Sequence, residues 1–335
     1  MKTLTQVPVG TQVFFGNAAK HRRRVEKLIN TVLKRWKYQE NIPPIFDYYD
    51  VFSRGMGSES EATLYRFFDR EGNLLAVRPE FTSLIAKTVA TRLLDWPKPL
   101  RLCYSGDVFR YEAPRGGRQR EFFQLGIENI GGKKVSCDAE VIQIAMESLQ
   151  RIGIKEFQFN LGEMGFFSGL IKKIGISTVD LKHIKNLMEL KDSIGLAGRM
   201  KQLNLSTKNK NVLYSLLNLT GKSKVISSAR HLVTNEQSMI ALENLESLYN
   251  KIKRQKLSKH LTIDLSGVRG LDYYTGIVFK IYVPGSGFEV GSVGRYDILL
   301  KNFGCDLPSV GFTFYLERLM PFFFVPFRDF TVSPL

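Results

Sequence analysis

The chain has 335 residues, with 48 Lys and Arg against 32 Asp and Glu, which gives a formal net charge of +16. At this length roughly three quarters of the unfolded chain's surface can be buried, and 44% hydrophobic with 24% charged residues excludes a disordered or collagen-like chain. No run of about 20 apolar residues and no signal-peptide pattern occurs, which predicts a cytoplasmic protein that spans no membrane.

Cysteine and histidine are too scattered to indicate a disulfide framework or a metal site. The three cysteines, Cys103, Cys137 and Cys305, include no closely spaced pair, and we expect them to be reduced thiols in the core. The four histidines are isolated from one another. We therefore predict no metal ion and no cofactor.

The N-terminal part of the chain alternates helical and extended patterns. Apolar residues at helical spacing predict a helix over residues 20–38, and the prolines of IPPIF end it. An extended segment is expected through residues 47–52. LYRFFD and NLLAVRP then read as two short strands joined by a turn at residues 70–73, and a helix is expected over residues 81–94.

Two long aromatic strands follow. LRLCYSGDVFRYE and REFFQLGIENIG alternate in polarity and flank the loop APRGGRQ, which predicts an antiparallel hairpin with a basic connection. Asp138 is expected to cap the next helix, which reaches Ile152, and EFQFNLG reads as the strand after it.

The middle of the chain is helical and basic. Residues 165–259 show Leu, Ile and Lys at helical spacing, with breaks near Gly175 and Gly195. Residues 171–262 hold 17 of the 48 Lys and Arg but only 6 of the 32 Asp and Glu, so most of the net charge lies there. We interpret this stretch as a helical insert between two β-rich parts.

Strand patterns return after the insert, in LTIDLSG, TGIVFKIYV and FEVGSVG, and SVGFTFYLERLM reads as a strand that runs into a helix. Together these elements predict an α+β fold, in which an antiparallel sheet with flanking helices is interrupted by a helical insert.

Polar side chains gather on one face of the long hairpin. Arg110 and Glu112 lie two apart on one strand, and Phe122, Gln124 and Glu128 share a face of its partner. An arginine, an aromatic ring and polar groups on one face would suit a nucleotide or amino-acid pocket. An ordinary solvated face with an ion pair explains the same pattern.

Two other segments offer candidate ligand groups. Glu80 and Thr82 join a strand to a helix, where they could bind an ammonium and a hydroxyl group or cap the helix. Arg269, Tyr273 and Tyr274 precede a strand and could recognise a carboxylate or an imidazole. The small residues of GSVGRYD indicate either a close backbone approach to a ligand or a tight turn, and no nucleophilic triad can be assembled.

These segments resemble one family. FRYEAPRGGRQREFFQLGIE and VGFTFYLERL are similar to motifs 2 and 3 of the class II aminoacyl-tRNA synthetases, and RGLDYYTGIVF is similar to the signature of histidyl-tRNA synthetases. The regulatory subunits of ATP phosphoribosyltransferase share these motifs. RPEFTSLIAKTVA and PPIFDYYDVF resemble the regulators, and only 17 residues follow Arg318, so the synthetases' C-terminal anticodon-binding domain is expected to be absent.

The resemblance implies a division of the chain into three parts. Residues 1–168 would form the first part of the synthetase-like core, with motifs 1 and 2. Residues 169–260 would form the helical insert. Residues 261–335 would complete the core with the histidine signature and motif 3.

The resemblance also implies site residues, position by position. The expected histidine-binding residues are Glu80, Thr82, Gln124, Glu128, Arg269, Tyr273 and Tyr274. Vestigial nucleotide-side positions fall at Arg110, Glu112, Arg118, Phe122 and Arg318. No residue is assigned a catalytic role.

The implied function is that of a non-catalytic regulatory subunit of ATP phosphoribosyltransferase. It would be required for activity of the short catalytic subunit and for histidine feedback inhibition in the first step of L-histidine biosynthesis. The implied partners are that catalytic subunit, a second copy of this chain in a homodimer within a hetero-octamer, and L-histidine as effector, with no tRNA. Two alternatives stay open: a histidyl-tRNA synthetase-like enzyme that activates histidine with ATP, and an assembly scaffold whose pocket binds nothing.

Overall fold

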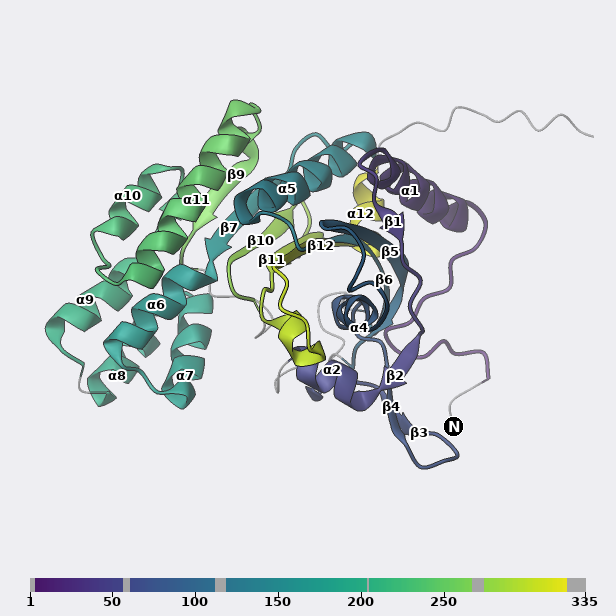
Figure 1. The fold of residues 1–335 in the computed structure, drawn as a ribbon, viewed down its shortest axis with the longest axis horizontal. Coiled ribbons are helices and arrows are strands. Elements are labelled where there is room, and N and C mark those ends of the chain that lie inside the picture. The colour runs from purple at the N-terminus through teal and green to yellow at the C-terminus, as the bar shows by residue number, and fades with distance from the viewer. Residues whose placement is uncertain (1–3, 57–60, 112–118, 204, 267–273, 324–335) are drawn as a thin grey trace, which may run out of the picture.

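A curved nine-stranded sheet forms the centre of the protein in the computed structural model (Figure 1). The structure describes residues 4–56, 61–111, 119–203, 205–266 and 274–323. The strands in chain order are β1 (Gln39–Glu40), β2 (Phe46–Tyr48), β3 (Arg66–Phe68), β4 (Leu74–Val77), β5 (Leu100–Phe109), β6 (Glu121–Ile130), β7 (Gln158–Glu163), β8 (Thr220–Gly221), β9 (Leu261–Asp264), β10 (Ile277–Tyr282), β11 (Gly291–Arg295) and β12 (Ser309–Tyr315).

Helices surround the sheet and fill the middle of the chain. The α-helices are α1 (Gly16–Arg35), α2 (Tyr49–Met56), α4 (Thr82–Arg92), α5 (Lys134–Arg151), α6 (Met164–Ile174), α7 (Thr178–Glu189), α8 (Ser193–Gln202), α9 (Thr207–Leu216), α10 (Lys224–Arg230), α11 (Glu236–Arg254) and α12 (Leu316–Leu319). The described residues also form short 3₁₀ turns, which are η1 (Ser258–His260), η2 (Leu299–Phe303) and η3 (Met320–Phe322).

The sheet has the order β1-β5-β6-β12-β11-β10-β7-β9-β8, and β2, β4 and β3 make a separate small sheet. The predicted hairpin of β5 and β6 is antiparallel, with Leu100 opposite Ile130 and Phe109 opposite Glu121. Neighbouring strands in the centre are antiparallel, whereas β1 pairs with β5, and β7 with β9, in parallel. The predicted α+β class is confirmed.

Alternation along β6 separates the two faces of the sheet. Phe123, Leu125 and Ile127 are buried in the main hydrophobic core with apolar residues of α1 and α5. Side chains two apart on a strand share a face, so the even-numbered residues, including Gln124 and Glu128, face the opposite side. The predicted grouping of those two polar residues on one face agrees with this alternation.

Helix α4 lies in the hollow of the curved sheet, on the face opposite α1 and α5 (Figure 1). Its buried Ile85 and Val89, with Phe81 just before it, form a second core with Leu102 and Tyr104 of β5. The ring of Phe81 stacks on that of Tyr104 at 4.4 Å between centroids. This packing fixes the N-terminal end of α4 against the sheet.

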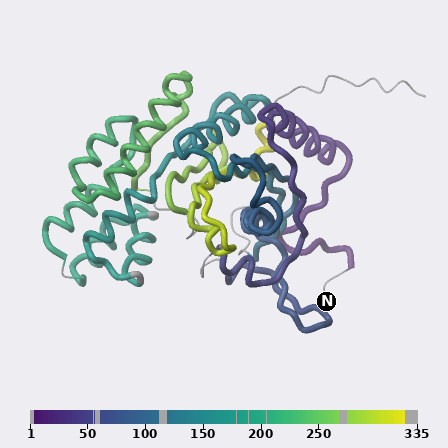
Figure 2. The backbone as a smooth tube through the Cα atoms, in the orientation of Figure 1, coloured from purple at the N-terminus to yellow at the C-terminus, as the bar shows by residue number. Residues whose placement is uncertain are grey.

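Helices α6 to α11 form a group beside the β7–β9 end of the sheet, as Figure 2 shows. The long helix α11 packs against both α6 and α5, and its Leu242, Leu245 and Leu248 are fully buried. Within the described ranges, no helix is long and apolar enough to cross a bilayer.

The expectation for residues 49–52 was wrong. Residues 49–52 were expected to be extended but begin α2, because Phe52 and Met56 are spaced one helical turn apart and pack against Leu84 of α4. The predicted break near Gly195, in contrast, is confirmed: α7 ends at Glu189 and α8 begins at Ser193, where the N-cap Asp192 accepts a hydrogen bond from the backbone N–H of Gly195.

Asp138 does not cap its helix. Helix α5 begins at Lys134, and Asp138 lies in its second turn, buried and paired with Arg295 of β11. The need to neutralise a buried arginine, rather than helix capping, explains the acidic residue there. The three cysteines are free and buried, as predicted.

Candidate functional site

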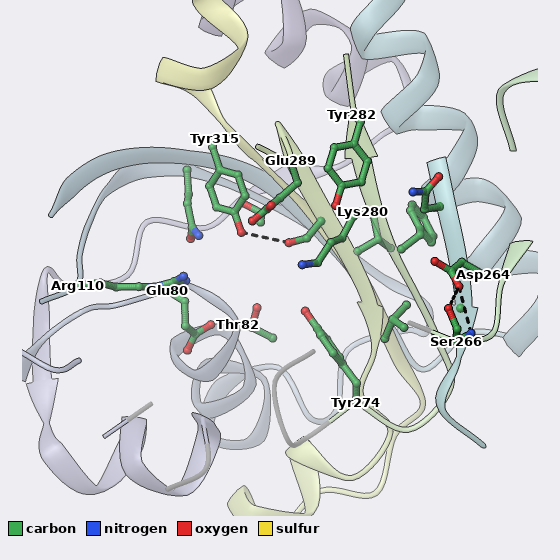
Figure 3. A pocket seen from close by; sticks show the side chains of 18 of the residues that line it. Glu80, Thr82, Arg110, Asp264, Ser266, Tyr274, Lys280, Tyr282, Glu289 and Tyr315 are labelled. Carbon is green, nitrogen blue, oxygen red and sulfur yellow. Dashed lines mark hydrogen bonds between the residues drawn. The ribbon is translucent and has the colours of Figure 1, made fainter. Parts of the chain in front are cut away.

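A cavity of about 400 Å³ lies over the face of the sheet that carries α4 (Figure 3). Its floor comes from the central strands, and its walls come from the N-terminal end of α4 and the C-terminal end of α7. The lining residues are Glu80, Thr82, Tyr104, Arg110, Gln124, Asn160, Gly162, Met188, Lys191, Asp264, Ser266, Tyr274, Val278, Phe279, Lys280, Tyr282, Glu289, Ser292, Val293, Thr313 and Tyr315.

The structure brings most of the described candidate residues together. Those that line the cavity are Glu80, Thr82, Arg110, Gln124 and Tyr274. Glu128 lines a small adjoining hollow of about 30 Å³, which it shares with Thr82 and Tyr274. Four of the predicted positions, Glu112, Arg118, Arg269 and Tyr273, lie outside the described residues.

Glu128 is the most deeply buried acid at the site, with 1% of its surface exposed. The hydroxyl of Thr82 donates to its Oε1 at 2.8 Å, and the hydroxyl of Tyr296 donates to its Oε2. Burial raises the pKa of Glu128 to about 8, although these two hydrogen bonds favour the carboxylate. The group is therefore protonated at neutral pH and can exchange a proton with a basic ligand.

Glu80 binds the first turn of α4 and also lines the cavity, so the helix-capping role is confirmed and the ligand-binding role stays a prediction. Its carboxylate accepts the backbone N–H of Ser83, with oxygen distances of 3.0 and 3.2 Å, so it satisfies a donor in the first turn of α4. The same side chain lines the cavity and is 4% exposed. The carboxylate of Glu80 is thus held in one position at the wall of the cavity.

Glycines form the floor beneath these groups. Gly311 of β12 lies opposite Glu128 of β6, and Gly294 of β11 lies opposite Gly311. A Cβ atom at Gly294 would lie 1.9 Å from the ring of Tyr274. The segment GSVGRYD is thus not a tight turn. It contains strand β11, and Gly294 leaves room for the ring of Tyr274 above the sheet; the close backbone approach to a ligand stays a prediction.

Gly311→Ala is expected to destabilise the protein by about 1–3 kcal/mol, because its Cβ would lie 1.7 Å from Oε2 of Glu128 and 2.4 Å from the Ile127 carbonyl oxygen. Urea unfolding measures the change. Gly198→Ala in α8 is the control, since no atom lies within 4 Å of its Cβ and alanine favours a helix. Equal stability of the two variants would contradict the packing described here.

The nucleotide-side positions are engaged with protein groups. The guanidinium of Arg110 lies over the ring of Phe122 at 5.3 Å, and its Nε donates to the Pro79 carbonyl at 2.9 Å. Arg318 donates to the carbonyl oxygen of Glu289 at 2.9 Å. Of these three predicted positions only Arg110 lines the cavity. Phe122 and Arg318 contact residues that line it, namely Arg110 and Glu289.

Sequence reasoning missed several lining residues. Lys280 lies between Val278 and Tyr282 on β10, and all three line the cavity. Their alternation is the signal that could have placed a lysine on this face. Lys191 follows α7, far from the strands in sequence, and no local pattern indicates that it reaches the same cavity.

Comparisons with known proteins agree with the sequence motifs. The family model described as histidyl-tRNA synthetase matches residues 12–319. A crystal structure described as an ATP phosphoribosyltransferase regulatory subunit/histidyl-tRNA synthetase from Bacillus halodurans is 30% identical, with a TM-score of 0.89, over 97% of this chain and 84% of that one.

Two curated relatives carry the same description. The ATP phosphoribosyltransferase regulatory subunit of Halothermothrix orenii is 35% identical over 313 residues, which are 93% of this chain and 74% of the relative. That of Moorella thermoacetica is 37% identical over 315 residues, which are 94% of this chain and 81% of the relative. The chain therefore belongs to the family of ATP phosphoribosyltransferase regulatory subunits, built on a histidyl-tRNA synthetase-like class II fold.

Proposed function

We propose that this chain makes a short-form ATP phosphoribosyltransferase catalytic subunit active and sensitive to histidine. Its family membership makes it a non-catalytic subunit with a regulatory role in histidine biosynthesis. The observation that carries the finer proposal is the cavity on the sheet, where two buried acids, Glu80 and Glu128, are held by hydrogen bonds beside Gln124 and Tyr274.

The cavity supplies a group for each part of histidine. Glu80 and Gln124 would bind the ammonium group, since a carboxylate and an amide oxygen are acceptors. Glu128, with Tyr274 beside it, would bind the imidazole and share one proton with it. Arg269 and Tyr273 belong to the proposed site through the family resemblance alone.

Feedback inhibition requires that histidine bind two states of the complex with different affinity. If histidine binds the inhibited state tenfold more tightly, it stabilises that state relative to the active one by about 1.4 kcal/mol. The cavity is bounded by α4 on one side and α7 on the other, so closure of these walls around histidine would give such a preference.

The assembly is part of the proposal. We place the core in residues 1–168 and 261–335 and the insert in residues 169–260, in a cytoplasmic hetero-octamer that contains homodimers of this chain and does not use tRNA. Exposed apolar side chains on and beside the small sheet support a protein-facing surface there: Ile42, Ile45, Phe46, Tyr48 and Phe68.

The direct test is an assay of phosphoribosyl-ATP formation by a short catalytic subunit with and without this chain. We expect activity to rise on addition and to fall again with histidine. Size measurement of the mixture by light scattering checks the assembly. If the added chain changes neither activity nor histidine sensitivity, the proposed function is wrong.

A synthetase-like activity is the second candidate, and the stacking of Arg110 over Phe122 at the edge of the cavity favours it. Histidine-dependent exchange of pyrophosphate into ATP tests it, and we expect no exchange. An inert scaffold would instead activate the catalytic subunit without binding histidine in a calorimeter.

A further inference from the structure

The net positive charge of the helical segment comes from two parts of its sequence. Residues 193–235 hold seven Lys and Arg and no Asp or Glu, and residues 247–263 hold five Lys and Arg and again no acid. Helix α11 contains the change, because its acidic residues end at Glu246 and its last turn carries only basic charges. The proposed function gives this charge no role.

The fold brings these two parts together beside the edge strand β8. This strand lies in the first part and pairs with β9, which begins in the second. Directly after β8, the ammonium group of Lys222 donates to the carbonyl oxygen of Lys259 at 3.2 Å and to that of Leu261. Two lysines that are 37 residues apart in sequence are therefore neighbours in space.

Helix α10 brings a further pair of lysines to the same place. It begins at Lys224, close to the contact with Lys259, and its other end reaches α11, where Arg230 pairs with Glu246 at 2.7 Å. Since Lys259 follows α11 in the chain, the two helices run antiparallel. Lys224 lies six residues before Arg230. Lys253 lies seven residues, or two turns, after Glu246, so both lysines lie at the C-terminal end of α11.

A buried histidine responds to two of these charges. The Nδ1 atom of His260 lies 3.0 Å from the carbonyl oxygen of Phe157. Burial lowers the pKa of His260, and the charges of Lys259 and Lys222 lower it further, against the opposite effects of that carbonyl and of Glu156. Because both lysines act on one ring, their charges lie on the same part of the surface.

Exposed basic side chains gather at this end of the helical segment and form what we call the basic patch: Lys222, Lys224, Lys253, Arg254, Lys256 and Lys259. Among the described residues, none of the six is in an ion pair. Glu156 acts on His260 but follows Lys155, so those two charges offset each other. The C-terminal end of α11 supplies only about half a negative charge. A negatively charged partner would therefore reduce the repulsion within the patch.

The side chains of the helical segment favour an acidic protein surface over a nucleic acid as that partner. Five of the six cations in the patch are lysines, whereas Arg199 and Arg230, which could bind phosphate with paired hydrogen bonds, already pair with acids. Between residues 171 and 262, the exposed large apolar side chains that the structure describes are all aliphatic. They offer no ring on which a base could stack.

We propose that the basic patch docks on an acidic surface of the short catalytic subunit. The proposal rests on the proposed function and deepens it, because it names the face of this chain that meets the partner. It also gives the helical segment a role in assembly, since opposite charges on two surfaces steer them together and set their orientation.

The rate of association with an immobilised catalytic subunit, measured by surface plasmon resonance, tests the docking face. The double variant Lys224→Glu/Lys256→Glu should lower the association rate constant about tenfold at low ionic strength, because it replaces attraction by repulsion. The rate for the parent chain should fall steeply as salt is added, and the difference between the two proteins should shrink with it.

The double variant Lys201→Glu/Lys208→Glu is the matched control. It changes the net charge by the same amount, again at exposed lysines near the end of one helix and the start of another. Helices α8 and α9 lie at the end of the helical segment away from the C-terminal end of α11 (Figure 1). The control should associate at nearly the rate of the parent chain, and both variants should melt within a few degrees of it.

Two results would overturn the docking face while leaving the proposed function in place. The first is association of Lys224→Glu/Lys256→Glu at the parent rate, and the second is equal slowing in the control, which would report overall charge alone. If the parent chain neither binds nor activates the catalytic subunit, the proposed function fails and the docking face fails with it.

A gel-shift titration with unfractionated tRNA tests the competing partner. We expect no shift at physiological salt for the parent chain. A saturable shift that is lost in Lys224→Glu/Lys256→Glu but kept in Lys201→Glu/Lys208→Glu would make the basic patch a nucleic-acid site, and the proposal of an acidic protein partner would be wrong.

Discussion

Glu128→Gln is expected to weaken histidine binding roughly 10- to 100-fold, because the amide cannot exchange a proton with the imidazole and a hydrogen bond to a charged group contributes about 1.5–3 kcal/mol. Titration calorimetry measures the dissociation constant. Glutamine keeps the size of the side chain, so Thr82 and Tyr296 keep a hydrogen-bonding partner.

The pH profile of binding distinguishes this role from a structural one. The complex holds one proton between Glu128, whose pKa is about 8, and the imidazole, whose ordinary pKa is about 6.5. Below about pH 6.5 both free groups are protonated, and binding must release a proton. Above about pH 8 both are deprotonated, and binding must take one up. Affinity should therefore be highest between these values and fall on either side.

Glu163→Gln is the matched control for Glu128→Gln. Burial also raises the pKa of Glu163 to about 8, but this residue lines neither the cavity nor the small adjoining hollow. Its replacement should leave histidine affinity unchanged. The amino group of histidine titrates equally with all three proteins. A loss of affinity above about pH 8 that is as large in Glu128→Gln as in the parent chain would therefore show that this carboxyl does not hold the imidazole.

Both glutamine variants should remain folded in alkaline solution. A carboxyl whose pKa is raised on folding from 4.5 to about 8 supports the native state fully below pH 4.5, and that support is lost as pH rises towards 8. An amide does not titrate, so each variant should be at least as stable as the parent chain at pH 8.5.

Arg295→Met is expected to cost about 3–5 kcal/mol of unfolding free energy, the largest stability loss that we predict. Arg295 is 3% exposed; its Nε donates to Asp138 at 3.0 Å and its guanidinium also donates to Asp297 at 2.8 Å. Removal of the arginine leaves the buried carboxylate of Asp138 on α5 without the cation that is hydrogen-bonded to it. Urea unfolding at pH 8 measures the loss.

The loss should shrink in acid. Burial raises the pKa of Asp138 to about 6 even beside the arginine, so without that charge the carboxyl is neutral at pH 5 and no ion is left unpaired. Arg230→Met removes an ion pair with Glu246 that is partly exposed, and should cost less than about 1 kcal/mol. Similar losses in the two variants would mean that the buried pair is energetically no different from a surface pair.

Local periodicity was enough to predict the elements that carry the proposed histidine site. Alternation placed Gln124 and Glu128 on one face of β6, and the strand-to-helix junction placed Glu80 and Thr82 at the start of α4. The side-chain period of a strand is a property of the backbone, so such a prediction needs no knowledge of the rest of the fold.

What could not be predicted depends on contacts between distant segments. Asp138 looked like a helix cap because its partner Arg295 lies 157 residues away. Residues 49–52 looked extended because Leu84, against which α2 packs, belongs to another helix. Lys191 reaches the cavity only because the helices after β7 lie beside the sheet, and no local pattern encodes that placement.

The parallel pairing of β7 with β9 sets a limit on how this chain can be shortened. Phe159 pairs with Leu261 and Leu161 with Ile263. Because the two strands are parallel, the chain leaves β7 at its C-terminal end and must return to the level of its N-terminal end before β9 begins. Parallel strands need a crossover of a dozen or more residues, and a tight turn cannot replace it. A deletion of the helices between these strands would therefore have to keep a connecting segment, such as α11, that is long enough for β9 to pair with β7.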